Sequence, residues 1–166
     1  MIAMVVYESM WGNTREVAEA IGSRLGDHVT VVDVADAPAR LPVELDLLVV
    51  GGPTHAFSMT RASTRRDAAE KGATGVHVER GIRDWIDEVE AEGVVDVATF
   101  DTRVGKVRHL PGSAAKSAGR HVRHHLGRLV GTESFWVEDM EGPLLEGELD
   151  RARAWGGKLA AHRAAL

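Results

Sequence analysis

Residues 7–25 read YESMWGNTREVAEAIGSRL and join an apolar run directly to a helical pattern. The run, residues 2–7 (IAMVVY), is rich in β-branched residues and predicts a buried strand. Apolar residues at four-residue spacing then predict a helix over residues 14–25. Between the two lies a turn, residues 9–14 (SMWGNT), that contains a glycine and short polar side chains. Parallel α/β proteins bind anions at such strand-to-helix turns, so this turn is the first candidate site.

The rest of the sequence continues the alternation of strands and helices. We predict strands at residues 28–34, 45–52, 94–100 and 134–139, and helices at 82–89, 113–129 and 147–166. The strands are apolar on both faces, which indicates a parallel sheet between two layers of helices. No repeat or linker divides the chain, so we expect a single domain over residues 1–166.

One long segment, residues 53–79, interrupts this alternation. A connection of that length in a compact domain is usually functional or contains an element of its own. Residues 63–71 (STRRDAAEK) predict a short helix capped by Ser63. We expect the segment to form a lid or a docking surface; the alternative is a poorly ordered loop.

The composition is typical of a soluble globular protein. The chain is 44% hydrophobic and 27% charged, with a formal net charge of −5. It has no cysteine, which excludes disulfides and thiolate chemistry. The first ten residues lack the pattern of a signal peptide, and no apolar run is long enough to span a bilayer. We therefore expect a cytoplasmic protein without a membrane partner.

Positive charge is concentrated in residues 101–130, which hold seven lysines and arginines and one carboxylate, Asp101. Such asymmetry can steer an anionic partner, although each single charge is more readily explained by a solvated helix face. Aromatic residues are scarce, so nucleic-acid binding is not expected. His121 and His125 lie one helical turn apart, but no neighbouring carboxylate or cysteine completes a metal site, and we expect none.

The turn itself has the chemistry of a phosphate site. Gly12 allows close approach of the backbone, and the helix that follows offers free N–H groups. Ser9, Asn13 and Thr14 add hydrogen-bonding side chains. Neither the Walker A pattern nor the GxGxxG fingerprint is present. The alternative is that Asn13 or Thr14 merely caps the helix.

These residues resemble the phosphate loop of the flavodoxin family, [TS]-x-T-G-N-T, which holds the phosphate of FMN. Ser9, Gly12, Asn13 and Thr14 match the pattern, whereas Trp11 stands where the family usually has threonine. The segments LLVVGGPTHAFSM, VATFDTRVGK and PLLEGELDRARAWGGKLA are similar to other parts of flavodoxin-like domains, so the resemblance covers nearly the whole chain. It implies a doubly wound α/β fold with strand order 2-1-3-4-5 and helices on both faces.

The resemblance also implies the residues that bind the cofactor. They form the phosphate loop and two flavin-contacting loops: Ser9, Met10, Trp11, Gly12, Asn13 and Thr14, then Pro53, Thr54, His55, Ala56 and Phe57, then Asp101, Thr102 and Arg103. His55, Phe57 and Trp11 are the candidates to stack on the flavin ring. If Arg103 lies at the ring, we expect it to stabilise the anionic reduced flavin; the alternative is a surface arginine with an ion-pair partner. In the family layout, Arg61, Arg65 and Arg66 of the long segment lie near the flavin edge.

The function that the resemblance implies is electron transfer by an FMN-binding, flavodoxin-like protein. Its partner would be a redox protein or a small-molecule acceptor, and we expect a monomer or a weak homodimer. Two alternatives stay open: an FMN-dependent reductase of a quinone or similar molecule, and a flavodoxin fold that has lost its cofactor. The cofactor carries the chemistry in such proteins, so we nominate no catalytic residue; His55 is the one attractive proton donor.

Overall fold

Five parallel strands form one sheet in the order β2-β1-β3-β4-β5, in a computed structural model that describes residues 1–165. The predicted strand order is therefore confirmed. The strands are β1 (Ile2–Tyr7), β2 (His28–Asp33), β3 (Leu47–Pro53), β4 (Val95–Val104) and β5 (Gly127–Val137). The helices are α1 (Asn13–Gly22), α2 (Ala62–Glu70), α3 (Ile82–Glu88), α4 (Ala114–His125) and α5 (Glu148–Ala164), with a short 3-10 turn, η1, at Gly105–Val107.

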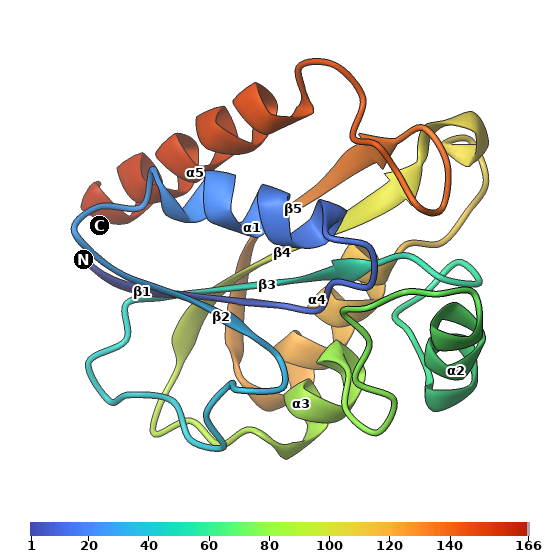
Figure 1. Cartoon of the computed structure of the whole chain (residues 1–166). Coiled ribbons are helices and arrows are strands. Elements are labelled where there is room, and N and C mark those ends of the chain that lie inside the picture. Colours follow the sequence, from blue (N-terminus) through green and yellow to red (C-terminus); the bar gives the residue numbers. More distant parts are fainter. Residues whose placement is uncertain (166) are drawn as a thin grey trace.

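Helices cover both faces of the sheet (Figure 1). On one face α1 and α5 pack against the strands, and on the other α3 and α4 do. Each face has its own apolar cluster, one around Trp85 and the other around Phe100, Phe135 and Trp155. The central strand β3 is apolar or glycine from Leu47 to Gly52 and buried over that stretch, as expected for a parallel strand covered on both faces.

Two predicted boundaries at the second half of the sheet were wrong. The predicted helix over residues 113–129 ends at His125, and β5 begins at Gly127, seven residues earlier than predicted. Gly127 lies so close to β4 that an added Cβ would overlap the carbonyl oxygen of Val95, so the chain turns into the sheet there. Leu129, predicted on the helix face, pairs with Val97 in the sheet instead.

Strand β4 is also longer than predicted, because it pairs with β5 as far as Val104. Asp101, Thr102 and Arg103 were expected in a loop and lie in this strand, opposite Ser134, Phe135 and Trp136. Their side chains therefore alternate between the two faces of the sheet.

The long segment contains the predicted short helix, α2, but its cap was predicted wrongly. The helix begins at Ala62 with Arg61 in the N-cap position, so Ser63 lies inside the first turn. The hydroxyl of Thr64 accepts a hydrogen bond from the Arg61 backbone N–H and donates one to the Arg61 carbonyl. In Figure 1, α2 and its flanking loops lie beyond the carboxyl ends of the strands.

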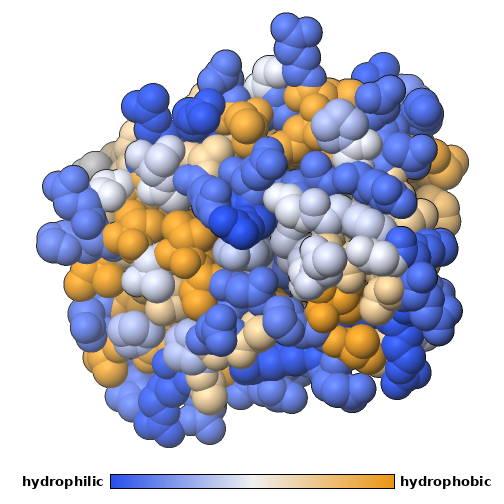
Figure 2. Space-filling model, viewed as in Figure 1, coloured by the Kyte–Doolittle hydropathy of each residue, from blue (hydrophilic) through white to orange (hydrophobic). Residues whose placement is uncertain are grey.

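Hydrophilic residues cover most of the face shown in Figure 2, with an apolar group over the edge strand β2. Val31 of β2 is 36% exposed there. No helix within residues 1–165 is long and apolar enough to cross a membrane.

Candidate functional site

A small pocket of about 40 Å³ opens at the carboxyl ends of β1, β3 and β4, where open α/β sheets bind ligands. We call it the carboxyl-edge pocket. Its walls are Met10, Trp11, Asn13, Thr14, Pro53, Thr54, His55, Thr102, Val104, Val137 and Met140. Among these eleven residues, only His55 has a side chain that can become charged near neutral pH. Eight of these residues are among those that the sequence suggested, and they come from three separate segments.

The turn over residues 9–14 is held by the buried hydroxyl of Ser9. Its Oγ accepts hydrogen bonds from the backbone N–H of Gly12 at 3.1 Å and of Arg15 at 3.3 Å. Gly12 is the N-cap of α1 and has a φ of 96°, a conformation that glycine adopts without strain. Neither Asn13 nor Thr14 caps the helix with its side chain, so the capping alternative is wrong.

The start of α1 is left with unused hydrogen-bond donors. Within the described part of the chain, no atom accepts a hydrogen bond from the backbone N–H of Asn13 or Thr14. The indole Nε1 of Trp11 is buried and has no partner among the same residues. The structure therefore places three N–H donors in residues that line the pocket.

The side chains of Asn13 and Thr14 connect the turn to distant segments. Thr14 Oγ1 lies 2.7 Å from Thr102 Oγ1 of β4, and Asn13 Nδ2 donates to the carbonyl of Glu141 at 3.0 Å. These bonds fix the turn against β4 and against the loop between β5 and α5. The wall of the pocket is thus held from both sides.

Thr54 is positioned by a buried carboxylate. Its hydroxyl donates to Asp101 Oδ2 at 2.9 Å and accepts from the backbone N–H of Ala114 at 2.8 Å. Asp101 Oδ2 also accepts from the N–H of Ala115 at 2.9 Å, so it satisfies the N-terminus of α4. Burial raises the pKa of Asp101. Asp101 does not line the pocket but positions a residue that does.

The chain reverses in a tight turn over residues 55–58. His55 and Ser58 exchange backbone hydrogen bonds of 2.9 and 3.0 Å. Ala56 and Phe57 between them both have positive φ, 46° and 64°, which is rare for residues with side chains. They do not line the pocket, and Phe57 is 53% exposed outside it.

His55 does line the pocket and is partly buried. Burial lowers the pKa of its imidazole, and the positive charge of Lys71 lowers it further. The ring is therefore neutral at pH 7 and offers one donor and one acceptor nitrogen.

Arg103 is buried and does not line the carboxyl-edge pocket. Its guanidinium donates to the carbonyl of Leu110 at 3.1 Å and lies 5.6 Å from the ring centroid of Trp136. Arg103 is buried and forms no ion pair within residues 1–165, so the alternative of a surface arginine with an ion-pair partner is wrong, while its place relative to a flavin ring stays a prediction.

Three lining residues were missed at the sequence level: Val104, Val137 and Met140. Val104 and Val137 are paired at the ends of β4 and β5, so the longer β5 register brings them together. Met140 comes from the following loop and carries no local signal for a site.

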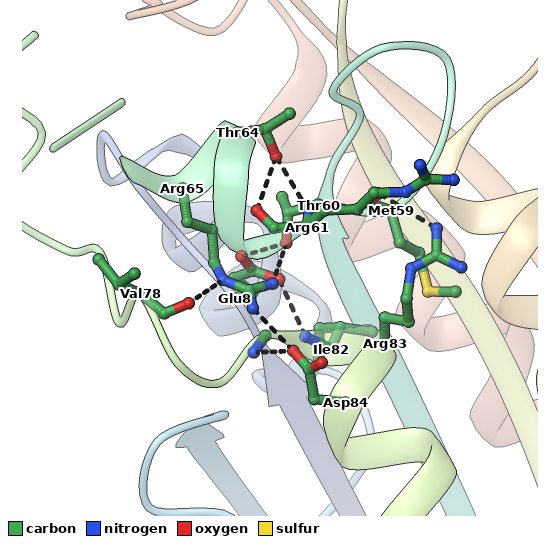
Figure 3. Close-up of polar contacts among 11 residues, drawn as sticks. Glu8, Met59, Thr60, Arg61, Thr64, Arg65, Val78, Ile82, Arg83 and Asp84 are labelled. Atoms are coloured by element: carbon green, nitrogen blue, oxygen red, sulfur yellow. Dashed lines mark hydrogen bonds and ion pairs between the residues drawn. The ribbon is translucent and has the colours of Figure 1, made fainter. Parts of the chain in front are cut away.

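A second missed feature is the buried carboxylate of Glu8, directly before the turn (Figure 3). Glu8 is 4% exposed; it accepts from Thr60 Oγ1 at 2.6 Å and from the N–H of Ile82 at 2.9 Å. Burial raises its pKa. The bonds tie the end of β1 to Thr60 of the long segment and to the first residue of α3.

Arg65 completes this network and is itself 2% exposed. It donates to Thr60 Oγ1 at 3.0 Å, to the carbonyl of Val78 at 2.8 Å and to Asp84 Oδ2 at 2.9 Å. Arg61 and Arg66, the other arginines considered for the flavin edge, are exposed. Arg65 therefore holds the long segment in place and does not face the carboxyl-edge pocket.

The histidines of α4 do not form a metal centre in this structure. Among residues 1–165, no three histidine, aspartate or glutamate side chains are close enough to hold a metal ion. His121 pairs with Asp87 at 3.1 Å.

Comparison with known proteins identifies the fold. Residues 4–64 match the sequence profile of a family described as the flavodoxin domain. A flavodoxin from the domain Archaea is 18% identical and covers 99% of both chains, with a TM-score of 0.64. Flavodoxin 1 from Bacillus cereus is also 18% identical, covers 98% of this chain and 99% of its own, and has a TM-score of 0.64. The chain has a flavodoxin-like fold.

The chain is thus structurally similar to a flavodoxin from the domain Archaea and to one from Bacillus cereus over nearly its whole length. No curated protein sequence matches it. At such identities the solved structures establish its fold, and the matched residues 4–64 include the turn over residues 9–14 and the turn over residues 55–58.

Proposed function

We propose that this flavodoxin-like protein binds FMN in the carboxyl-edge pocket and transfers electrons to a redox partner protein or a small-molecule acceptor. One observation carries the proposal: the backbone N–H groups of Asn13 and Thr14 have no acceptor within the described residues, and both residues line the carboxyl-edge pocket. Free N–H groups at the positive end of a helix dipole favour a phosphate.

The donor set fits a phosphate group. Ser9 Oγ accepts two hydrogen bonds within the turn, which leaves its hydroxyl hydrogen free to donate. Thr14 can accept from Thr102 and still donate its own hydrogen. The indole N–H of Trp11 adds a donor where the flavodoxin pattern has a threonine hydroxyl.

The remaining walls fit a flat, mostly apolar ring. Val104, Val137 and Met140 supply apolar surface, and Thr54 and His55 supply polar groups on the opposite segment. FMN, when bound, supplies the redox chemistry, and the chain binds it, orients it and limits its contact with water. The neutral His55 imidazole can accept a proton at the pocket wall, or donate its N–H in a hydrogen bond.

The test of cofactor binding is a visible absorption spectrum of the purified protein, before and after addition of FMN and desalting. We expect flavin bands that stay with the protein. A protein that remains colourless after desalting would contradict the proposal and support a flavodoxin fold without its cofactor.

Thr14→Val tests the phosphate contact. It removes one hydroxyl at nearly constant volume, and we expect the Kd for FMN to rise about tenfold or more, because a hydrogen bond to a charged group contributes about 1.5–3 kcal/mol. Thr132→Val is the matched control: Thr132 Oγ1 pairs with Thr99 Oγ1 at 3.2 Å, outside the pocket. If both variants lost the same affinity for FMN, the loss in Thr14→Val would not come from a contact between Thr14 and the phosphate.

The second candidate function is an FMN-dependent reductase of a quinone or similar molecule. The observation that favours it is His55, a neutral imidazole at the pocket wall. The turnover rate of the FMN-bound protein with NAD(P)H and a quinone distinguishes the two functions. A reductase should turn over rapidly, and the His55→Gln variant should be slower. An electron carrier should turn over slowly, whether residue 55 is histidine or glutamine.

A further inference from the structure

A second hollow, which we call the basic pocket, lies against α4. It is an open hollow of about 390 Å³, lined by Ser58, Arg61, Arg83, Ser117, Arg120, His121, His124 and His125. Three arginines and three histidines thus line one site, and no carboxylate is among its walls. They come from the long segment, from α3 and from α4, so the fold and not a single charged stretch brings them together.

Arg83 is the most firmly placed of these cations. It is half-buried and donates to Ser58 Oγ at 3.1 Å and to the carbonyl of Met59 at 3.3 Å. Its Nε is buried with no partner among the described residues. Figure 3 shows the guanidinium groups of Arg83 and Arg61 extending to the same side, away from the Glu8 network.

The basic pocket has little negative charge to balance these cations. None of Arg61, Arg83 and Arg120 has an ion-pair partner within residues 1–165. Among residues 1–165, the one carboxylate that pairs with a lining side chain is Asp87, at His121. A partly buried arginine without a counter-charge is unfavourable, and an anion that enters would supply that charge.

We infer that the basic pocket binds a small polyanion, a molecule with two or more phosphate or carboxylate groups. Guanidinium groups bind both kinds of anion through paired hydrogen bonds, and three of them from three segments favour more than one anionic group. The serine hydroxyls of Ser58 and Ser117, 3.1 Å apart, add polar partners on the wall. The inference does not depend on FMN, because the lining residues of the two pockets are different.

The two pockets are nevertheless connected by the turn over residues 55–58. Ser58 lines the basic pocket and His55 lines the carboxyl-edge pocket, and the two residues exchange backbone hydrogen bonds across one turn. A polyanion in the basic pocket would therefore lie beside the proposed cofactor site, on the far side of the turn over residues 55–58.

Calorimetric titration of the full chain with pyrophosphate and, separately, with citrate tests the inference, with ionic strength held constant by KCl. We expect saturable binding of one molecule per chain, and the preferred probe tells phosphate from carboxylate chemistry. Arg120→Gln is expected to weaken binding about tenfold, since it removes a charge-assisted contact from an exposed position that is not needed for folding.

Arg123→Gln is the matched control. Arg123 is an exposed arginine on the same helix that does not line the basic pocket, so the variant has the same net charge as Arg120→Gln. Its affinity should equal that of the unmodified chain. Equal weakening by both variants would show a general charge effect, and absence of saturable binding of either probe at constant ionic strength would also overturn the inference.

Discussion

Glu8 joins the end of β1 to the long segment through a carboxylate that is almost wholly removed from water. The sequence places it one residue before the phosphate loop but gives no sign of its partners, because Thr60 and Ile82 are more than fifty residues away. A similar limit applies to Asp101, which was expected to contact the cofactor and instead holds Thr54 and the start of α4. The role of a single buried polar residue depends on such contacts with distant segments, and no local sequence pattern indicates them.

Glu8→Gln is expected to change how stability depends on pH. Burial raises the pKa of Glu8 in the folded protein, so the folded state holds its proton more tightly than the unfolded state does. The contribution of Glu8 to stability is therefore complete below about pH 4.5 and is lost as the pH rises through the raised pKa.

Denaturant unfolding at a series of pH values measures this effect. The free energy of unfolding of the unmodified protein, relative to Glu8→Gln, should fall as the pH rises above about 4.5. Glu44→Gln, at an exposed position, is the control for the same change of charge. A difference between the unmodified protein and Glu8→Gln that does not change with pH would count against a buried, proton-holding carboxylate.

Helices α1 and α5 pack closely on one face of the sheet, and adjacent glycines of α5 have opposite surroundings. A Cβ added at Gly156 would overlap the carbonyl oxygen of Ile21 in α1, whereas one added at Gly157 would meet nothing within 4 Å. We expect Gly156→Ala to destabilise the fold by about 1–3 kcal/mol through overpacking. Gly157→Ala should stabilise it by about 0.5–1 kcal/mol, because alanine is the better helix former.

Thermal unfolding of the two variants checks this pair, each serving as the control of the other. If Gly156→Ala were as stable as the unmodified protein, or Gly157→Ala less stable than it, the result would contradict the close packing of α5 on α1 at Gly156.

The elements most fully predicted were those with an uninterrupted pattern. The strand at residues 2–7 and the helix from Ile82 were predicted at nearly their observed bounds, since their apolar periodicity is complete. The boundary between α4 and β5 was not, because Leu126 and Leu129 fit a helical period as well as a strand. Pairing with β4, a tertiary contact, decided the outcome.

At the scale of the whole molecule, the order of the strands and most of the residues that line the carboxyl-edge pocket could be predicted from the sequence. The alternation of elements predicts a parallel sheet, and a parallel sheet brings residues 9–14, 53–55 and 102 to one edge. The residues that complete the pocket from β5 and its following loop, and the cations that form the basic pocket, required the three-dimensional arrangement of segments far apart in the chain.

The central claim is that the turn over residues 9–14 binds the phosphate of FMN. Its most direct test compares the Kd of FMN with that of riboflavin, which has the same ring system and no phosphate, by quenching of flavin fluorescence. Several hydrogen bonds to a phosphate, each of about 1.5–3 kcal/mol, predict that FMN binds at least about 100-fold more tightly. Equal affinity for the two flavins would contradict the account, because the free N–H groups at the start of α1 would then have no part in binding.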